Sequence, residues 1–250
     1  MESKKKSIRR YGLIGKNIEY SFSRGYFKQK FENENLIDCS YENFDLENIY
    51  ALSEVLKQEH ISGLNVTIPY KREVIPFLDT LSLAAEKINA VNTIKFEEDG
   101  SISGHNTDVY GFEKSLFELV ATLPKKALIL GTGGASSAIA YVFEKSDIEF
   151  SYVSRKEGAN TFRYNALDNE ILREHLLIVN ASPVGTFPNI DQAPELPYHG
   201  LTKNHILYDL IYNPLETKFL KEGKQRNCII SNGLKMLEYQ AEKSWEIWNQ

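Results

Sequence analysis

Short apolar or alternating stretches follow one another along the first hundred residues, separated by stretches with helical spacing. Strands are predicted at 11–15, 39–44, 63–69 and 90–96. Apolar residues recur at intervals of three or four in 25–35, 46–59 and 78–87, which predicts helices. The turn at 97–100 predicts a hairpin with a return strand at 101–104. Alternating strands and helices favour a parallel or mixed sheet.

The second half repeats this alternation with stronger apolar strands. A helix is predicted from Asp108 to about residue 120, followed by strands at 125–130, 150–153, 176–180, 206–211 and 228–230 and a last helix at 235–248. Thr107 or Asp108 is the expected N-cap of the joining helix. We therefore predict an α/β protein with domains at 1–104 and 105–232 and a C-terminal helix at 233–250.

Composition excludes several functional classes. The 250 residues suit two modest domains or one large one, and the formal charge of −5 argues against a nucleic-acid partner. The basic run of Lys4, Lys5 and Lys6 is read as a solvated tail. No apolar run reaches the length of about 18 residues that a membrane helix needs. Cys39 and Cys228 lack metal-ligand spacing, so we expect no metal site and a cytoplasmic protein with reduced thiols.

A glycine-rich segment follows the predicted strand 125–130 and opens a helix. Its residues are Gly131, Thr132, Gly133, Gly134 and Ala135, with Ser136 where a third glycine is usual. Such glycines let backbone amides approach a pyrophosphate at the helix N-terminus. The next strand ends in Ser154 and Arg155 rather than in a carboxylate, and a basic residue there accommodates a 2′-phosphate. These features predict NADP as the cofactor.

Several polar residues of the first half are candidates for a ligand site, each with an ordinary structural alternative. Ser21 and Ser23 would point the same way in an extended loop and could clamp an oxyanion, or they could cap the following helix. Asn92 lies within an apolar strand and needs partners, which could be backbone or a ligand hydroxyl. Lys71 could be catalytic or an ordinary surface lysine. In the last helix, Gln240 is a polar exception that could reach a ligand.

Taken together and in this order, the motifs resemble the shikimate dehydrogenase family over nearly the whole chain. The matching segments are Ser21-Phe22-Ser23, Asn65-Val66-Thr67-Ile68-Pro69-Tyr70-Lys71, Ala90-Val91-Asn92-Thr93, Gly104-His105-Asn106-Thr107-Asp108, Gly131-Thr132-Gly133-Gly134-Ala135, Asn180-Ala181-Ser182-Pro183-Val184-Gly185, Asp209-Leu210-Ile211-Tyr212-Asn213-Pro214 and Asn232-Gly233-Leu234-Lys235-Met236-Leu237-Glu238-Tyr239-Gln240-Ala241. The family usually has His before the first serine and Pro after the second, where this chain has Tyr20 and Arg24.

The resemblance implies a substrate-binding domain with a mixed sheet, a Rossmann-type, doubly wound NADP-binding domain, and a C-terminal helix that returns to the first. It also implies the reversible reduction of 3-dehydroshikimate to shikimate, a step towards chorismate and the aromatic amino acids, by a monomer or homodimer. The site residues that it implies are Lys71 and Asp108 as the catalytic pair; Ser21, Ser23, Thr67, Asn92, Asp108, Tyr212 and Gln240 around the substrate; and Gly131, Thr132, Gly133, Gly134, Ala135, Ser154, Arg155 and Gly233 around the cofactor.

The reduction of a ketone requires such a pair of groups, independently of the resemblance to a family. When a ketone receives a hydride, an alkoxide develops, and a cation able to donate a proton stabilises and quenches it. Lys71 can do so, and a neighbouring carboxylate such as Asp108 favours the charged ammonium. Alternative predictions are a quinate/shikimate or aminoshikimate dehydrogenase, which would share the pair, and a non-catalytic sensor of the same metabolites, which could lose it without losing binding.

Overall fold

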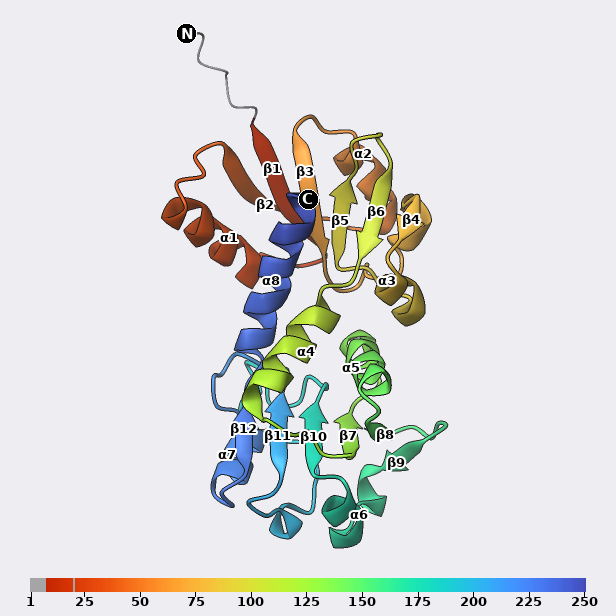
Figure 1. Cartoon of the computed structure of the whole chain (residues 1–250), viewed down its shortest axis with the longest axis vertical. Coiled ribbons are helices and arrows are strands. Elements are labelled where there is room, and N and C mark those ends of the chain that lie inside the picture. Colours follow the sequence, from red (N-terminus) through yellow and green to blue (C-terminus); the bar gives the residue numbers. More distant parts are fainter. Residues whose placement is uncertain (1–7, 20) are drawn as a thin grey trace. The chain divides into compact units, whose positions relative to one another are not determined.

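The structure, a computed structural model, describes residues 8–19 and 21–250 and consists of two compact units (Figure 1). Unit 1 comprises the described residues up to Thr107 together with Ala241–Gln250, and unit 2 comprises Asp108–Gln240. The divisions thus fall after Thr107 and Gln240, whereas we expected them after residues 104 and 232. The second difference arises because the first part of the last helix packs within unit 2, where Lys235 pairs with Glu118 at 3.3 Å. Lys4, Lys5, Lys6 and Tyr20 lie outside the described residues.

Unit 1 is built on a six-stranded mixed sheet with the strand order β2-β1-β3-β5-β6-β4. β1 is parallel to β2 and β3, β5 is antiparallel to β3 and β6, and β4 is parallel to β6. The strands are β1 (Arg9–Gly15), β2 (Cys39–Asp45), β3 (Ile61–Val66), β4 (Thr80–Leu81), β5 (Thr93–Phe96) and β6 (Ile102–His105). The helices are α1 (Phe22–Asn33), α2 (Leu52–Leu56) and α3 (Leu83–Ile88), with 3-10 turns at Ile49–Ala51 and Ile75–Phe77.

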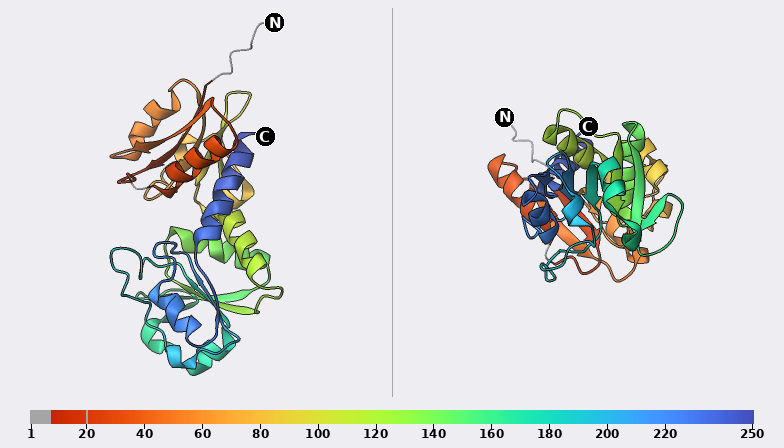
Figure 2. Two further views of the ribbon diagram at one scale, coloured as in Figure 1. Left: turned by 90° about the vertical axis from the view of Figure 1, so that its left-hand side faces the viewer. Right: turned by 90° about the horizontal axis from the view of Figure 1, so that it is seen from below.

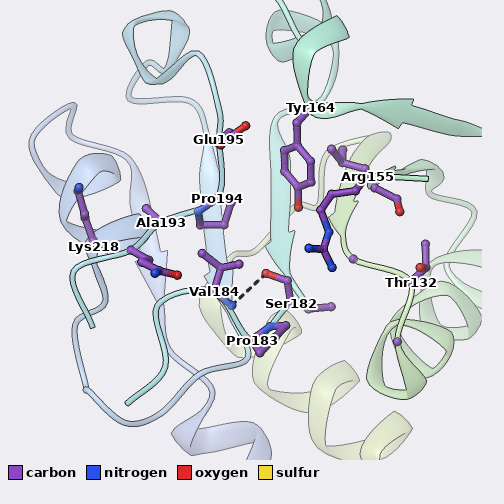
Figure 3. A pocket seen from close by; sticks show the side chains of 16 residues that line it. Thr132, Arg155, Tyr164, Ser182, Pro183, Val184, Ala193, Pro194, Glu195 and Lys218 are labelled. Atoms are coloured by element: carbon purple, nitrogen blue, oxygen red, sulfur yellow. Dashed lines mark hydrogen bonds between the residues drawn. The ribbon is translucent and has the colours of Figure 1, made fainter. Parts of the chain in front are cut away.

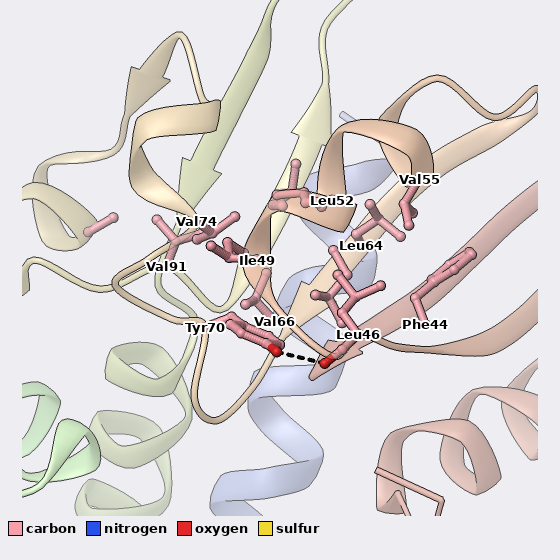
Figure 4. Packing of buried hydrophobic residues seen from close by; sticks show 13 residues of the cluster. Phe44, Leu46, Ile49, Leu52, Val55, Leu64, Val66, Tyr70, Val74 and Val91 are labelled. Atoms are coloured by element: carbon pink, nitrogen blue, oxygen red, sulfur yellow. Dashed lines mark hydrogen bonds between the residues drawn. The ribbon is translucent and has the colours of Figure 1, made fainter. Parts of the chain in front are cut away.

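The two faces of this sheet carry different cores, because successive side chains of a strand point to opposite sides. On one face, α2, α3 and the first 3-10 turn cover an aliphatic cluster that includes Leu64 and Val66 of β3 (Figure 4). There the hydroxyl of Tyr70 donates to the carbonyl of Leu46 at 2.6 Å. On the other face, α1 and the end of the last helix cover an aromatic cluster (Figure 2). Tyr11 and Trp248 meet in it with ring centroids 4.9 Å apart.

Unit 2 contains a six-stranded, wholly parallel sheet with the order β9-β8-β7-β10-β11-β12. Counted along the chain this is 3-2-1-4-5-6, the strand order of the Rossmann fold. The strands are β7 (Lys126–Leu130), β8 (Glu149–Ser154), β9 (Thr161–Arg163), β10 (Leu177–Asn180), β11 (Ile206–Asp209) and β12 (Ile229–Ser231). The helices are α4 (Asp108–Leu119), α5 (Gly134–Lys145), α6 (Asn169–Glu174), α7 (Lys218–Lys224) and the first part of α8 (Leu234–Trp248), whose remainder belongs to unit 1, with 3-10 turns at Tyr164–Ala166 and Tyr198–Gly200.

Helices cover both faces of the second sheet. On one face Phe112 of α4 packs against Phe143 of α5 and Tyr208 of β11, with ring centroids 5.8 and 5.1 Å apart. On the opposite face Leu172 of α6 and Phe219 of α7 join the buried aliphatic side chains of the strands. The predicted fold class, an α/β chain with a mixed sheet and a doubly wound Rossmann-type sheet, is confirmed.

Several helices differ from their predicted bounds for local reasons. The helix expected at 78–87 begins only at Leu83, because the Ser82 hydroxyl caps it by accepting from the amide of Ala85. The helix expected at 46–59 is reduced to a 3-10 turn, capped by Asn48, and α2. α6, α7 and β9 had no sequence prediction. Among the described residues, no helix is both long and apolar enough to cross a membrane.

Candidate active site and nucleotide-binding cavity

Unit 2 holds a cavity of about 810 Å³ at the carboxyl ends of its central strands (Figure 3). The loops after β7, β8 and β10 contribute Gly131, Arg155 and Ser182 to its wall. β7 and β10 are adjacent, and the strand order reverses between them. Ligands of open α/β sheets bind in the crevice at this switch point. The cavity therefore lies where the fold places a nucleotide.

The glycine loop is shaped for close approach. Gly131 has φ +107°, a conformation that side chains disfavour, and a Cβ there would lie 3.2 Å from the Ala181 carbonyl oxygen. Around Gly133 and Gly134, a Cβ would meet nothing within 4 Å, so the backbone is open on that side. Gly133 is the N-cap of α5, whose first amides have no partner within the helix. This loop fits a pyrophosphate.

Arg155, directly after β8, supplies a positive charge to the cavity wall. Its guanidinium extends into the cavity near Tyr164 and Ser182 (Figure 3). Burial raises the pKa of Tyr164, and the nearby charge of Arg155 opposes that shift. Within residues 8–19 and 21–250, Arg155 forms no ion pair with a carboxylate, so its charge can meet an anionic ligand. Arg155 and Ser154 thus line the cavity at the strand end where the sequence predicts that a 2′-phosphate binds.

The predicted cofactor residues fall into two groups. Gly131, Thr132, Gly133, Ser154 and Arg155 line the cavity, whereas Gly134 and Ala135 continue into α5 without lining it. Gly233 also lies outside the lining, and a Cβ there would overlap the carbonyl of Leu210. A glycine is therefore required at 233 by backbone packing alone.

The cavity wall also contains residues that were not predicted from the sequence, three of which carry polar side chains of interest. Tyr164 follows β9, Gln192 lies in a long loop, and Lys218 opens α7. Their only available signal was position after a strand or before a helix, and neither β9 nor α7 was predicted. Lys218 is a second cation of the wall, and Figure 3 shows it on the opposite side from Arg155.

A buried carboxylate anchors two loops beside the cavity. Asp209, at the end of β11, is fully buried. It accepts hydrogen bonds from the Thr217 hydroxyl at 2.6 Å, the Asn180 amide at 3.0 Å and the Ile211 backbone at 3.0 Å. Asn180 in turn accepts from the hydroxyl of Ser182, a wall residue, at 2.7 Å. Asp209 thereby holds the loops after β10 and β11.

This carboxylate makes folding stability depend on pH. Burial raises the pKa of Asp209 from its ordinary 3.8 to about 6, so the fold favours the protonated acid. Stability from this group is full below about pH 4 and is lost as the pH rises to about 6. A shift of this size corresponds to about 3 kcal/mol. Urea unfolding at about pH 4 and about pH 7 should show that wild type loses roughly this amount relative to Asp209→Asn, whose amide cannot ionise. A pH-independent difference between the two proteins would contradict the assignment.

In unit 1, the predicted oxyanion clamp has a different form from the one expected. The loop at 17–25 is not extended throughout, because α1 begins at Phe22, earlier than the predicted residue 25. Ser21 is the N-cap residue but makes no side-chain capping bond, and Ser23 lies in the first helical turn. The two hydroxyls therefore do not follow strand alternation. Ser23 instead hydrogen-bonds the hydroxyl of Tyr41, opposing the rise that burial causes in the pKa of Tyr41.

Three other predicted residues, Thr67, Lys71 and Asn92, are held by hydrogen bonds within unit 1. Thr67 follows β3, and its amide donates to the carbonyl of Ile14 at the end of β1. The carbonyl of Lys71 accepts from the amide of Val91 at 2.7 Å, directly before Asn92. Asn92 is 3% exposed, and its side-chain oxygen accepts from the amide of Thr107 at 2.7 Å. The backbones of Lys71 and Thr107 are thus both tied to the segment 91–92.

The remaining predicted residues belong to unit 2. Asp108 is the first residue of α4 and follows Thr107 directly. Tyr212 directly follows Ile211, whose amide donates to Asp209, and burial raises the pKa of Tyr212. Gln240 of α8 is 7% exposed and donates to the carbonyl of Leu237 in its own helix at 2.9 Å.

The strand order and the cavity define a dinucleotide-binding protein of the Rossmann class. Comparison with known proteins is more specific. The profile of the shikimate dehydrogenase substrate-binding domain matches residues 13–94. The NADP⁺ shikimate dehydrogenase of Desulforamulus reducens is 35% identical, covering 95% of this chain and 88% of the relative. The chain belongs to the shikimate dehydrogenase family.

Solved structures agree with this membership. Shikimate 5-dehydrogenase from Thermus thermophilus, in complex with NADP(H) and shikimate, has a TM-score of 0.83 and 30% identity, covering 96% of this chain and 93% of that one. Shikimate 5-dehydrogenase from Listeria monocytogenes, in complex with shikimate and NAD, has a TM-score of 0.87 and 30% identity, with 97% and 92% covered. The predicted family is confirmed.

Proposed function

We propose that the chain is an NADP-dependent oxidoreductase that reversibly reduces 3-dehydroshikimate to shikimate, in the biosynthesis of chorismate and the aromatic amino acids. The observation that carries the proposal is the cavity of unit 2, whose wall includes a glycine loop and Arg155, in a chain of the shikimate dehydrogenase family. No observation favours quinate or an aminated analogue as the substrate. Cys39 and Cys228 lack the spacing of metal ligands, which favours two reduced thiols and therefore action in the cytoplasm.

The residues of the cavity fit NADP. The open backbone at Gly133 and Gly134 would hold the pyrophosphate, and Ser154 and Arg155 would bind the 2′-phosphate. Bound NADPH supplies the hydride that the carbonyl carbon receives. Gly131 lets the loop lie close to the segment after β10, at Ala181 and Ser182.

We assign the substrate to unit 1, because residues 13–94 match the substrate-binding profile of the family. Ser21 and Ser23 would bind the carboxylate, with Tyr212 nearby. Thr67, Asn92 and Gln240 would bind the ring hydroxyls. Ser23 would have to turn its hydroxyl from Tyr41 to the carboxylate to donate to it, since a serine has one proton.

Lys71 and Asp108 would act on the ketone. As the carbonyl carbon gains a hydride, its oxygen becomes an alkoxide, and the ammonium of Lys71 donates a proton to it. Asp108 would keep Lys71 protonated and accept a hydrogen bond from the adjacent substrate hydroxyl. Support comes from the backbone ties of Lys71 and Thr107 to the segment 91–92, because Asp108 is joined to Thr107 by a peptide bond.

The activity can be tested with the purified wild-type chain. We expect 3-dehydroshikimate to cause oxidation of NADPH, followed by the loss of absorbance of the reduced nicotinamide, and shikimate to cause the reverse reaction with NADP⁺. NADH should be a much poorer reductant, because it lacks the phosphate that Arg155 would bind. A chain that binds shikimate and NADP⁺ but does not turn over in either direction would instead be a metabolite sensor.

A further inference from the structure

Five buried polar side chains of unit 1 form one hydrogen-bonded group behind the proposed substrate site. We call it the Ser244 cluster; its members are Asn65, Asn92, Thr93, Thr107 and Ser244. None of them is more than 4% exposed. They come from β3, the segment before β5, β5 itself, the segment after β6, and α8. Only Asn92 among them has a proposed contact with substrate.

The cluster determines which way the amide of Asn92 faces. The backbone N–H of Thr107 donates to Asn92 Oδ1 at 2.7 Å, and the hydroxyls of Thr107 and Thr93 donate to the same oxygen at 3.2 Å each. A backbone N–H can only donate, so the side of Asn92 that faces Thr107 must be its oxygen. The Nδ2 group then lies on the other side of the amide, where the proposed function has it donate to a ring hydroxyl.

Ser244 is the member of the cluster that contacts both threonines. Each threonine hydroxyl has one proton, and once it is given to Asn92 its oxygen can only accept. Ser244 Oγ lies 2.8 Å from Thr93 Oγ1 and 3.2 Å from Thr107 Oγ1. Ser244 also accepts from Asn65 Nδ2 at 2.9 Å, so its oxygen joins β3 to both threonines. Without Ser244, a threonine can turn its proton to its neighbour, 3.3 Å away, and release Asn92.

The place of Ser244 is fixed by the part of α8 that belongs to unit 1. Trp248 donates from its indole Nε1 to the carbonyl of Ile94 in β5 at 2.9 Å. Glu242 pairs with Lys30 of α1 at 2.9 Å and accepts from the hydroxyl of Tyr26. Ser244 lies between these two anchors along the helix and is fully buried. Its hydroxyl therefore reaches the threonines in one defined position.

We propose that Ser244 is a positioning residue of the substrate site, which holds the amide of Asn92 with its donor side towards a ring hydroxyl of shikimate. The proposal rests on the proposed function. The proposal extends the site to a residue that makes no contact with substrate and lies 152 positions beyond Asn92 in the chain. The last helix would thereby contribute to substrate affinity through hydrogen bonds inside unit 1.

The test compares Ser244→Ala with wild type in the oxidation of shikimate. We expect the KM for shikimate to rise about fivefold, as the misplacement of one hydrogen bond predicts, with the KM for NADP⁺ changed less than about twofold. Thr107→Val keeps the shape of the side chain and removes a donor to Asn92, so it should raise the same KM. Calorimetric titration with shikimate should give a matching change in Kd.

Ser115→Ala is the matched control. Ser115 is also a buried helical serine, and its hydroxyl lies 2.6 Å from the hydroxyl of Tyr208 in unit 2. Both alanine variants should lower the melting temperature, but Ser115→Ala should leave the KM and Kd for shikimate unchanged.

If Ser244→Ala lowers the melting temperature and leaves shikimate affinity unchanged, Ser244 is merely structural and the proposal is wrong. If wild type binds shikimate without turnover, the proposed function fails, and the Kd values alone decide about Ser244. Failure of wild type to bind shikimate would overturn both.

Discussion

Replacing Lys71 by alanine is expected to lower the kcat for reduction of 3-dehydroshikimate by about 10³-fold, with little change in the KM. A positioned proton donor contributes about 10²–10⁴-fold, and the ammonium also stabilises the developing alkoxide. Because both effects arise mainly in the transition state, kcat and kcat/KM should fall together. Steady-state kinetics with NADPH, for wild type and Lys71→Ala, measures this directly.

Arg72→Ala is a suitable control for this experiment. Arg72 is the next residue in the same turn after β3, is exposed, and has no assigned role in the reaction. Its removal takes away one positive charge from the same region, so a general effect of charge would appear in both variants. We expect Arg72→Ala to keep kcat within about twofold of wild type. If Lys71→Ala kept most of its turnover, another group would have to supply the proton.

Replacing Arg155 by alanine is expected to lower kcat/KM for NADPH by about 100-fold and to leave kcat/KM for NADH nearly unchanged. The guanidinium projects into the cavity and would make charge-assisted hydrogen bonds to the 2′-phosphate, each of which is stronger than a neutral one. NADH lacks that phosphate, so it has no such bonds to lose. Kinetics with both reduced cofactors, at one concentration of 3-dehydroshikimate, gives the ratio that reports cofactor preference.

Arg163→Ala controls for the loss of an arginine from unit 2. Arg163 ends β9 and pairs on the surface with Glu157 at 2.8 Å. It does not line the cavity, so its removal should leave the preference for NADPH unchanged. Equal losses with NADPH and NADH in Arg155→Ala would show that Arg155 supports the cavity as a whole rather than the 2′-phosphate.

The nucleotide half of the site was predictable because its signals are local. A buried strand, a glycine turn and a helix follow one another within residues 125–145, and β7, the turn at Gly131 and α5 occupy those positions. The position of Arg155 at the end of the next strand was predictable for the same reason. Site residues whose positions depend only on neighbouring residues of the chain can be predicted from the sequence.

Other parts of the cavity wall could not be found in this way. Tyr164 and Lys218 reach the cavity because β9 pairs with β8 and α7 packs on β11 and β12, and neither element has a strong pattern of its own. The conformation of the serine pair could not be predicted either, because the sequence does not show that α1 begins at Phe22 and places Ser23 in a helix.

By itself, the sequence determined the alternation of strands and helices, the glycine loop, the basic residue after β8 and the residue types that ketone reduction requires. These depend on interactions between residues close together in the chain. Only the tertiary structure decided that Asn65, Asn92, Thr107 and Ser244 share one set of hydrogen bonds, and that Asp209 anchors two loops of the cavity. A buried hydrogen bond needs its two partners at about 3 Å, and only the packing of distant segments brings such partners together.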